Sequence, residues 1–297
     1  MTAQIIDGKK VAEAVFGDLK TRVERLAKAG IVPGLATVLI GDDPASQVYV
    51  GHKIKACARI GMASIHKPLP RDAGQTEALN VIEGLNLDPA VHGIIVQLPV
   101  PPQLDPEALV QKLDPAKDAD GLHPINQGKL FRAKSWKDIE AGGVSIPCTP
   151  FGVIQLLKHY NLPVAGKKAV VVGRSSLVGK PLAQLLLALD ATVTVCHSRS
   201  GDLKAFTREA DILAAAIGKA GMITGDMVKP GAVVVDVGIS RTESGLKGDV
   251  DFESARAAAS WLTPVPGGVG PMTVAMLLTN TVRAAEKAYA RLATKKG

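Results

Sequence analysis

The sequence predicts an α/β protein with two domains, each built on a parallel sheet. Short apolar segments alternate with longer amphipathic ones along most of the chain, and this alternation is typical of βαβ units. A proline-rich stretch at residues 99–150 interrupts the alternation and separates the two halves. The length of 297 residues agrees with this division, because one domain takes about 150 residues.

The composition is that of a folded globular protein with an aliphatic core. Hydrophobic residues make up 46% of the chain and aromatic residues 3%, which excludes a disordered chain. Cys57, Cys148 and Cys196 have neither disulfide-framework nor metal-ligand spacing, so we expect reduced packing residues and no metal site. Charged residues interrupt the most apolar stretches and no signal sequence is evident, so we expect a cytoplasmic protein without a membrane partner.

The formal net charge of +7 raises nucleic-acid binding as an alternative function. The basic residues are dispersed, however, and no known nucleic-acid-binding signature is present, so we expect no nucleic-acid partner. A modest positive charge equally suits small anions, such as a phosphorylated cofactor or a polycarboxylate substrate.

Local signals place the elements of the first half. Asp7 is the predicted N-cap of a helix that ends at Gly30, and Asp43 with Pro44 begins a second helix that ends before Gly61. The βαβαβ order of this half predicts a parallel sheet. The remaining predicted elements are strands at 34–41, 62–66 and 92–98 and helices at 75–85 and 105–113.

The second half resumes the alternation and predicts a doubly wound domain of the dinucleotide-binding type. A long amphipathic helix at 271–293 is long enough to return to the first domain. We expect domains at 1–146 and 147–280, a C-terminal helix at 281–297, and a cleft between the two domains. The other predicted elements are helices at 151–160, 179–189 and 202–209 and strands at 168–173, 192–196, 211–217, 232–238 and 261–265.

A glycine-containing turn joins the first strand and helix of the second half. In VVVGRSSLVGKP, Gly173 ends the strand, and Gly179 begins the helix with Pro181 close behind. Such a turn brings backbone amides and a helix N-terminus to a phosphate, although the spacing differs from G-x-G-x-x-G. An ordinary βα turn that uses glycine for its backbone freedom is the alternative.

The end of the next strand indicates which dinucleotide is bound. An NAD enzyme carries a carboxylate there, whereas the 2′-phosphate of NADP needs cations and hydroxyl groups. Residues 196–200 contain no carboxylate but provide His197, Ser198 and Arg199, and Arg174 adds a second guanidinium. We therefore expect a Rossmann-like, NADP-binding domain; a solvated loop is the alternative.

Tyr49, Lys53 and Gln97 form a candidate catalytic set in the first half. Tyr49 and Lys53 are four residues apart on a predicted helix, and Gln97 ends a predicted strand where ligands bind in open α/β sheets. A lysine that is desolvated in a cleft can exchange protons near neutral pH. The alternatives are a lysine lying along an exposed helix and an amide that bonds to the backbone.

Two loops supply further candidates. Asp118 and Asp120 precede Gly121, and a carboxylate there can orient a flat heterocycle or simply shape a turn. The glycine loop VPGGVGPMT includes residues 266–268 and leads into the last helix. It suits backbone contact with a ligand or serves as a flexible connection.

Together these segments resemble the bifunctional methylenetetrahydrofolate dehydrogenase/cyclohydrolase family over nearly the whole chain. The matching segments, in order, are YVGHKIKAC, GIIVQLPVP, KDADGLHP, PCTP, VVGRSSLVGKP, DVGI and PGGVGPMT. The departures are Ala119, Leu122 and Ser176, where valine, phenylalanine and asparagine are usual. None of the three removes a polar group that the chemistry needs.

The resemblance implies a folate-binding catalytic domain, an NADP-binding domain and a homodimer. It assigns proton transfer to Lys53, pterin packing to Tyr49, and control of the lysine and pterin binding to Gln97 and Asp120. It also implies NADP contacts at Gly173, Arg174, Ser175 and Ile239. The residue patterns above add His197 and Ser198 as expected NADP contacts and Pro266, Gly267 and Gly268 as expected folate contacts.

The implied reactions are consecutive. The first oxidises 5,10-methylenetetrahydrofolate to 5,10-methenyltetrahydrofolate with NADP, and the second hydrolyses that product to 10-formyltetrahydrofolate. The first needs only alignment of two rings, whereas the second needs proton transfer. A monofunctional NAD(P)-dependent dehydrogenase of related fold is the alternative, but it leaves Tyr49, Lys53 and Gln97 unexplained.

Overall fold

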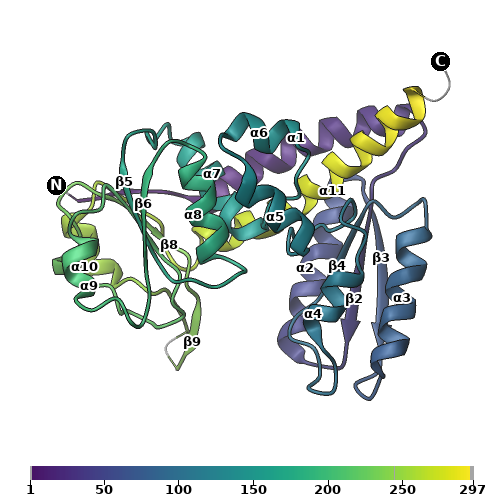
Figure 1. Cartoon of the computed structure of the whole chain (residues 1–297), viewed down its shortest axis with the longest axis horizontal. Helices are drawn as coiled ribbons and strands as arrows, with labels where there is room; N and C mark the ends of the chain where they lie inside the picture. Colours follow the sequence, from purple (N-terminus) through teal and green to yellow (C-terminus); the bar gives the residue numbers. More distant parts are fainter. Residues whose placement is uncertain (1, 244, 295–297) are drawn as a thin grey trace. The chain divides into compact units, whose positions relative to one another are not determined.

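A computed structural model describes residues 2–243 and 245–294, which form two compact units (Figure 1). The three-stranded unit comprises Ala14–Gln127 and the segment that begins at Leu277. The six-stranded unit comprises Gly128–Met276 and the first residues of the chain, up to Glu13. This grouping by contacts places residues 128–146 with the six-stranded unit, whereas the expected division falls after residue 146. The first residues join the same unit because the N-terminal strand β1 pairs within its sheet.

The three-stranded unit has the predicted βαβαβ order. Its sheet has the strand order β3-β2-β4, and both neighbouring pairs are parallel. Every residue of the central strand β2 is buried, as expected for a parallel strand covered on both faces. The elements are β2 (Gly34–Ile40), α2 (Pro44–Ile60), β3 (Ala63–Leu69), α3 (Gln75–Leu87), β4 (Gly93–Val96) and α4 (Pro106–Lys112).

Helix α2 begins and ends at its predicted signals. The Asp43 side chain accepts a hydrogen bond from the Ser46 amide at 2.7 Å, and Pro44 is the first helical residue. Gly61 ends the helix with a φ of 78°, a left-handed conformation that glycine adopts without strain. Because both ends are set locally, the register that buries Lys53 and Cys57 is set as well.

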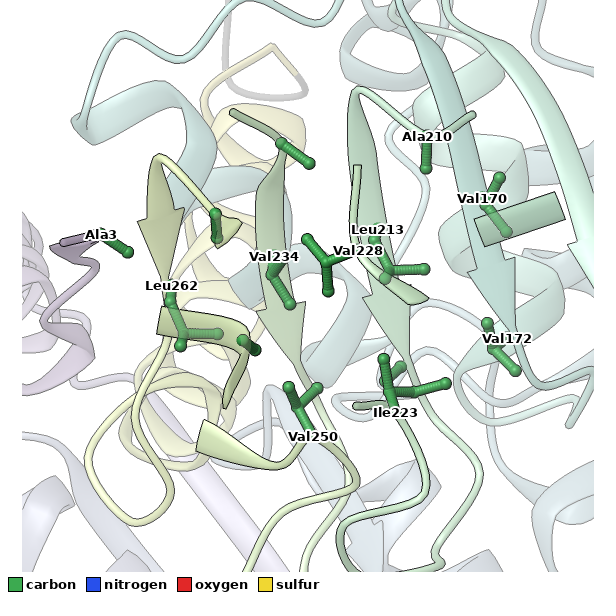
Figure 2. Close-up of a cluster of buried hydrophobic side chains, with 14 of the residues drawn as sticks. Ala3, Val170, Val172, Ala210, Leu213, Ile223, Val228, Val234, Val250 and Leu262 are labelled. Carbon is green, nitrogen blue, oxygen red and sulfur yellow. The ribbon is translucent and has the colours of Figure 1, made fainter. Parts of the chain in front are cut away.

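The six-stranded unit is a parallel sheet with the strand order β1-β11-β8-β7-β5-β6. Its core is aliphatic, and Val170, Leu213 and Val234 from three neighbouring strands lie within it (Figure 2). The strands are β1 (Gln4–Ile5), β5 (Lys168–Val172), β6 (Thr192–Cys196), β7 (Ile212–Ala215), β8 (Val233–Asp236) and β11 (Trp261–Leu262). The helices that accompany them include α7 (Cys148–His159), α8 (Gly179–Leu187), α9 (Leu203–Thr207) and α10 (Phe252–Ala258).

Several elements depart from the sequence prediction. The stretch 99–150, for which one short helix was expected, also contains α5 (Pro124–Arg132) and α6 (Trp136–Ala141). Proline at the start of α5 and a capping box between Ser135 and Asp138 are the local reasons. The further elements not predicted are β1, α10, the short 3-10 turn η1 (Gly225–Met227) and the hairpin of β9 (Ser240–Thr242) and β10 (Gly245–Lys247).

The two longest helices are α1 (Gly8–Lys28) and α11 (Val269–Thr294). Within the three-stranded unit they are joined by Arg22, which donates to both oxygens of Glu286 at 3.0 and 2.7 Å. This partly buried pair raises the pKa of Arg22, and the arginine lowers the pKa of Glu286. No helix among the described residues is long and apolar enough to cross a membrane.

Candidate functional site

Lys53 is buried and bonded to Gln97. Its side chain is 8% exposed, and its Nζ donates a hydrogen bond to Gln97 Oε1 at 2.7 Å. Gln97 follows β4 directly, at the carboxyl edge of the sheet, and its Nε2 donates to the Leu98 carbonyl at 2.7 Å. The amide therefore both orients the lysine and bonds to the backbone, and the alternative of an exposed lysine is wrong.

Tyr49 and Cys57 lie one helical turn before and after Lys53 and differ in exposure. The Tyr49 side chain is 52% exposed and meets His52 edge to face, so its ring is accessible to a ligand. Cys57 is fully buried, and this burial raises the pKa of its thiol to about 12. The thiol therefore stays protonated at neutral pH. All three cysteines are buried, and none of them forms a disulfide among the described residues.

Asp118 builds the loop that carries Asp120. We call residues 118–123 the Asp118 loop. The Asp118 carboxylate is 1% exposed and accepts hydrogen bonds from the backbone amides of residues 121, 122 and 123 at 3.0, 3.2 and 2.9 Å. Asn126 donates a fourth hydrogen bond at 2.8 Å. With these bonds Asp118 satisfies the backbone amides of the turn, while Asp120 lies half-buried in the same loop.

The Asp118 loop is hydrogen-bonded to β4, the strand that Gln97 follows. Ala119 donates to the Ile94 carbonyl in β4 at 3.2 Å, and the Ala119 carbonyl accepts from Asn280 of α11 at 3.0 Å. Asn126 and Asn280 are therefore supporting residues that the sequence analysis missed. A buried carboxylate needs several hydrogen-bond donors, and Asn126, eight positions after Asp118, was the sequence feature that could have indicated one of them.

In the six-stranded unit, the Gly173 turn (residues 173–179) is as tight as its glycines suggested. Gly173 has a φ of 129°, and a Cβ there would collide with the Ala216 carbonyl. A Cβ on Gly179 would collide with the Gly173 carbonyl. Ser175 Oγ accepts from the amides of Val178 and Gly179 at 3.2 and 3.4 Å. The turn presents the exposed Arg174 at the carboxyl end of β5.

The loop after β6 is the neighbour of the Gly173 turn, because β5 and β6 pair in parallel. His197 donates its amide to Ser200 Oγ at 2.8 Å, and its Nδ1 accepts the Arg199 amide at 3.1 Å. Ser198 and the side chain of Arg199 remain exposed. Ile239, which follows β8 at the same edge, is 46% exposed. The predicted cofactor residues thus follow the carboxyl ends of β5, β6 and β8, three strands of one parallel sheet.

The glycine loop at 266–268 has a structural role at the start of helix α1. The Gly267 carbonyl accepts the amides of Gly8 and Lys9, at 3.0 and 3.2 Å, and so caps the start of α1. A Cβ on Gly8 would collide with the Gly268 carbonyl. Helix α11 begins at Val269, two residues before the predicted start. The loop belongs to the six-stranded unit, whereas Lys53, Gln97 and Asp120 belong to the three-stranded unit.

Comparison with known proteins gives full-length matches. Residues 6–120 match the tetrahydrofolate dehydrogenase/cyclohydrolase catalytic domain, and residues 147–289 match the NAD(P)-binding domain of the same enzymes. The bifunctional protein FolD of Moorella thermoacetica is 54% identical over 288 residues, covering 97% of this chain and all of that protein.

Two solved structures are similar over the same length. The bifunctional FolD dehydrogenase/cyclohydrolase of Campylobacter jejuni is 45% identical with a TM-score of 0.91, covering 96% of this chain and 99% of that one. The FolD of Trypanosoma brucei, complexed with NADP cofactor and inhibitor, is 39% identical with a TM-score of 0.90, covering 97% and 99%.

Proposed function

The chain belongs to the tetrahydrofolate dehydrogenase/cyclohydrolase family, and we propose that it performs two consecutive reactions on one folate substrate. The enzyme oxidises 5,10-methylenetetrahydrofolate to 5,10-methenyltetrahydrofolate with NADP. It then hydrolyses this product to 10-formyltetrahydrofolate. The buried Lys53 ammonium, held by the Gln97 amide at 2.7 Å, carries the proposal, because hydrolysis needs a positioned proton carrier and hydride transfer does not.

We propose that the folate is held by residues with complementary chemistry. The exposed Tyr49 ring offers an apolar face for the flat pterin. The Asp120 carboxylate is positioned by the Asp118 loop and accepts hydrogen bonds from the pterin amino and N–H groups. Pro266, Gly267 and Gly268 offer backbone contacts to the same substrate.

The residues at the carboxyl edge of the six-stranded sheet fit NADP. Gly173 and Gly179 have no room for a Cβ, and this keeps the turn from β5 to α8 as tight as a dinucleotide-binding turn needs to be. Arg174, His197, Ser198 and Arg199 suit a 2′-phosphate, and residues 196–200 contain no carboxylate to repel it. When bound, NADP supplies the hydride acceptor; the protein's part is alignment.

In the hydrolytic step, water adds to the methenyl carbon and loses a proton. The bond between that carbon and N5 of the folate then breaks, N5 takes up a proton, and the added hydroxyl loses its remaining proton to become the carbonyl of the formyl group on N10. We propose that Lys53 Nζ transfers these protons and that Gln97 keeps the ammonium aimed at the reacting carbon. Net, one water is consumed and one proton released.

Lys53→Met tests this division of labour. We expect hydrolysis of added methenyltetrahydrofolate to fall by a factor of about 10² to 10⁴, the usual share of acid–base catalysis, while NADP reduction is largely retained. Methenyltetrahydrofolate should then accumulate in the coupled assay. Lys55→Met, an exposed lysine on the same helix, is the control. Equal loss of both activities in a folded variant would refute the proposal, and accumulation in the unaltered protein would favour the monofunctional alternative.

The domain bounds, the homodimer, the cytoplasmic location and the cleft between the domains also stay predictions. The homodimer is checked by light scattering of the purified protein over a range of concentrations.

A further inference from the structure

Two buried aspartates at the carboxyl edge of the six-stranded sheet have no part in the chemistry above. Asp236 ends β8 and is 3% exposed, and Asp249 follows the β9–β10 hairpin and is fully buried. A buried carboxylate is costly unless its oxygens are fully bonded, so the partners of the two side chains indicate what they are for.

The Asp249 carboxylate holds the loop that follows β7. Its Oδ2 accepts the amides of Ile217 and Gly218 at 2.5 and 3.0 Å, and its Oδ1 accepts the amide of Lys219 at 2.7 Å. Three consecutive amides facing one anion form a concave anion site, and here the protein's own carboxylate fills it. Gly218 and Lys219 are themselves exposed, but their backbone amides are held by a buried residue.

Asp236 in turn positions Asp249. Its two oxygens accept the amides of Asp249 and Val250, both at 2.9 Å. Close packing fixes this arrangement, because a Cβ on Gly248 would collide with the Asp236 carboxylate and one on Gly238 with the Asp249 carboxylate. The two carboxylates thus connect the end of β8 to the loop after β7.

The loop held by Asp249 supports the Gly173 turn. Gly173 packs on the Ala216 carbonyl too closely for any side chain, and the Ala216 amide bonds to the Val172 carbonyl at 2.8 Å. A shift of residues 217–219 would therefore move Ala216, and with it the surface on which Gly173 rests.

We propose that Asp249 is a positioning residue for the dinucleotide cofactor: by holding residues 217–219 it sets the backbone that supports the Gly173 turn. The inference rests on the proposed binding of NADP at this edge. Because the three amides already face Asp249, this loop contributes its shape rather than amide donors to the cofactor site.

Asp249→Asn tests the proposal. An amide keeps the size of the side chain but turns an NH₂ group toward backbone N–H donors, so the loop loosens. We expect the Kd of NADP, measured by titration calorimetry without folate, and the KM for NADP to rise about tenfold or more. Hydrolysis of added methenyltetrahydrofolate, which uses Lys53 in the other unit, should be unchanged. Asp251→Asn, an exposed neighbour, is the control.

Gly238→Ala provides a second variant, since it displaces the Asp249 carboxylate without removing it. Its control is Gly128→Ala, where an added Cβ meets open space. Should either folded variant bind NADP like the unaltered protein, or lose both activities by the same factor, the proposal is overturned.

Hydrogen exchange of the unaltered protein without cofactor tests the premise that Asp249 holds residues 217–219, even if both variants fail to fold. The amides of the exposed residues 218 and 219 should exchange slowly because Asp249 holds them, and rapid exchange contradicts the proposal. Failure of the proposed function is distinguishable, because the unaltered protein would then show no NADP binding at all.

Discussion

In the three-stranded unit, Asp118 accepts hydrogen bonds from the backbone amides of residues 121–123, and in the six-stranded unit, Asp249 accepts them from residues 217–219. Both loops stand beside parallel strands, and both carboxylates are almost fully buried. The two units therefore stabilise a site loop by the same device, a carboxylate that replaces water as the partner of three amides.

The groups beside the two loops differ. In the three-stranded unit the candidate catalyst, Lys53, is buried and bonded to Gln97, as proton transfer in a dry environment requires. In the six-stranded unit the candidate cofactor residues Arg174 and Arg199 are exposed, as capture of a charged ligand from solution requires. A buried carboxylate that holds three amides therefore supports a candidate catalytic site in one unit and a candidate cofactor site in the other. The exposure of the neighbouring charged side chains distinguishes the two sites.

The largest expected effect is on the Asp118 loop. Asp118→Ala leaves three backbone amides and one Asn126 donor without a partner in a buried place. We expect the free energy of unfolding to fall by at least about 3 kcal/mol, measured by urea denaturation, since each orphaned group costs roughly 1–3 kcal/mol. Asp105→Ala, which removes an exposed helix N-cap, should cost only about 1 kcal/mol. Similar losses in the two variants would contradict the buried-carboxylate argument.

The next effect concerns the exposed cations of the six-stranded unit. In the double variant Arg174→Gln with Arg199→Gln, we expect kcat/KM for NADP to fall about thirtyfold, corresponding to roughly 2 kcal/mol for lost charge-assisted hydrogen bonds. The kcat/KM for NAD should stay nearly constant, because NAD lacks the 2′-phosphate. Arg208→Gln, at the end of α9, is the control. A parallel fall for both cofactors would show that the arginines do not read the phosphate.

The smallest expected effect is a pH dependence of stability that comes from Asp236, the buried carboxyl group that positions Asp249. Burial raises the pKa of Asp236 to about 7, with the charge of Asp249 adding to the rise. Between about pH 4 and pH 7 the folded protein therefore holds a proton that the unfolded chain has released. This contribution to stability is full below about pH 4, falls progressively as the pH rises, and is lost once the pH has passed through about 7.

We therefore expect the free-energy advantage of the unaltered protein over Asp236→Asn to shrink by about 1.4 kcal/mol from pH 5 to pH 6. Urea denaturation at the two pH values measures it, with Asp251→Asn as the control for a lost negative charge. A pH-independent difference would show that Asp236 is ionised throughout this range.

Local signals were sufficient for most of the fold. Asp43, Pro44 and Gly61 predicted both ends of α2, and β6 lies at its predicted residues 192–196. Strand β1 was not predictable in the same way, because two residues carry too little pattern and their pairing partner β11 is more than 250 positions away. Helix α5 begins with a proline and α6 has a capping box, but the surrounding prolines obscured these start signals.

The sequence by itself determined the alternation of strands and helices, the family, and the residue types available for proton transfer and phosphate binding, because these depend on neighbouring residues and motif spacing. Only the tertiary structure decided that Lys53 is buried against Gln97 and that Tyr49 is exposed. It also decided that the carboxylates of Asp118 and Asp249 accept hydrogen bonds from backbone amides. Burial and hydrogen bonding depend on segments distant in sequence, and it is these that set the charge state and geometry of a side chain.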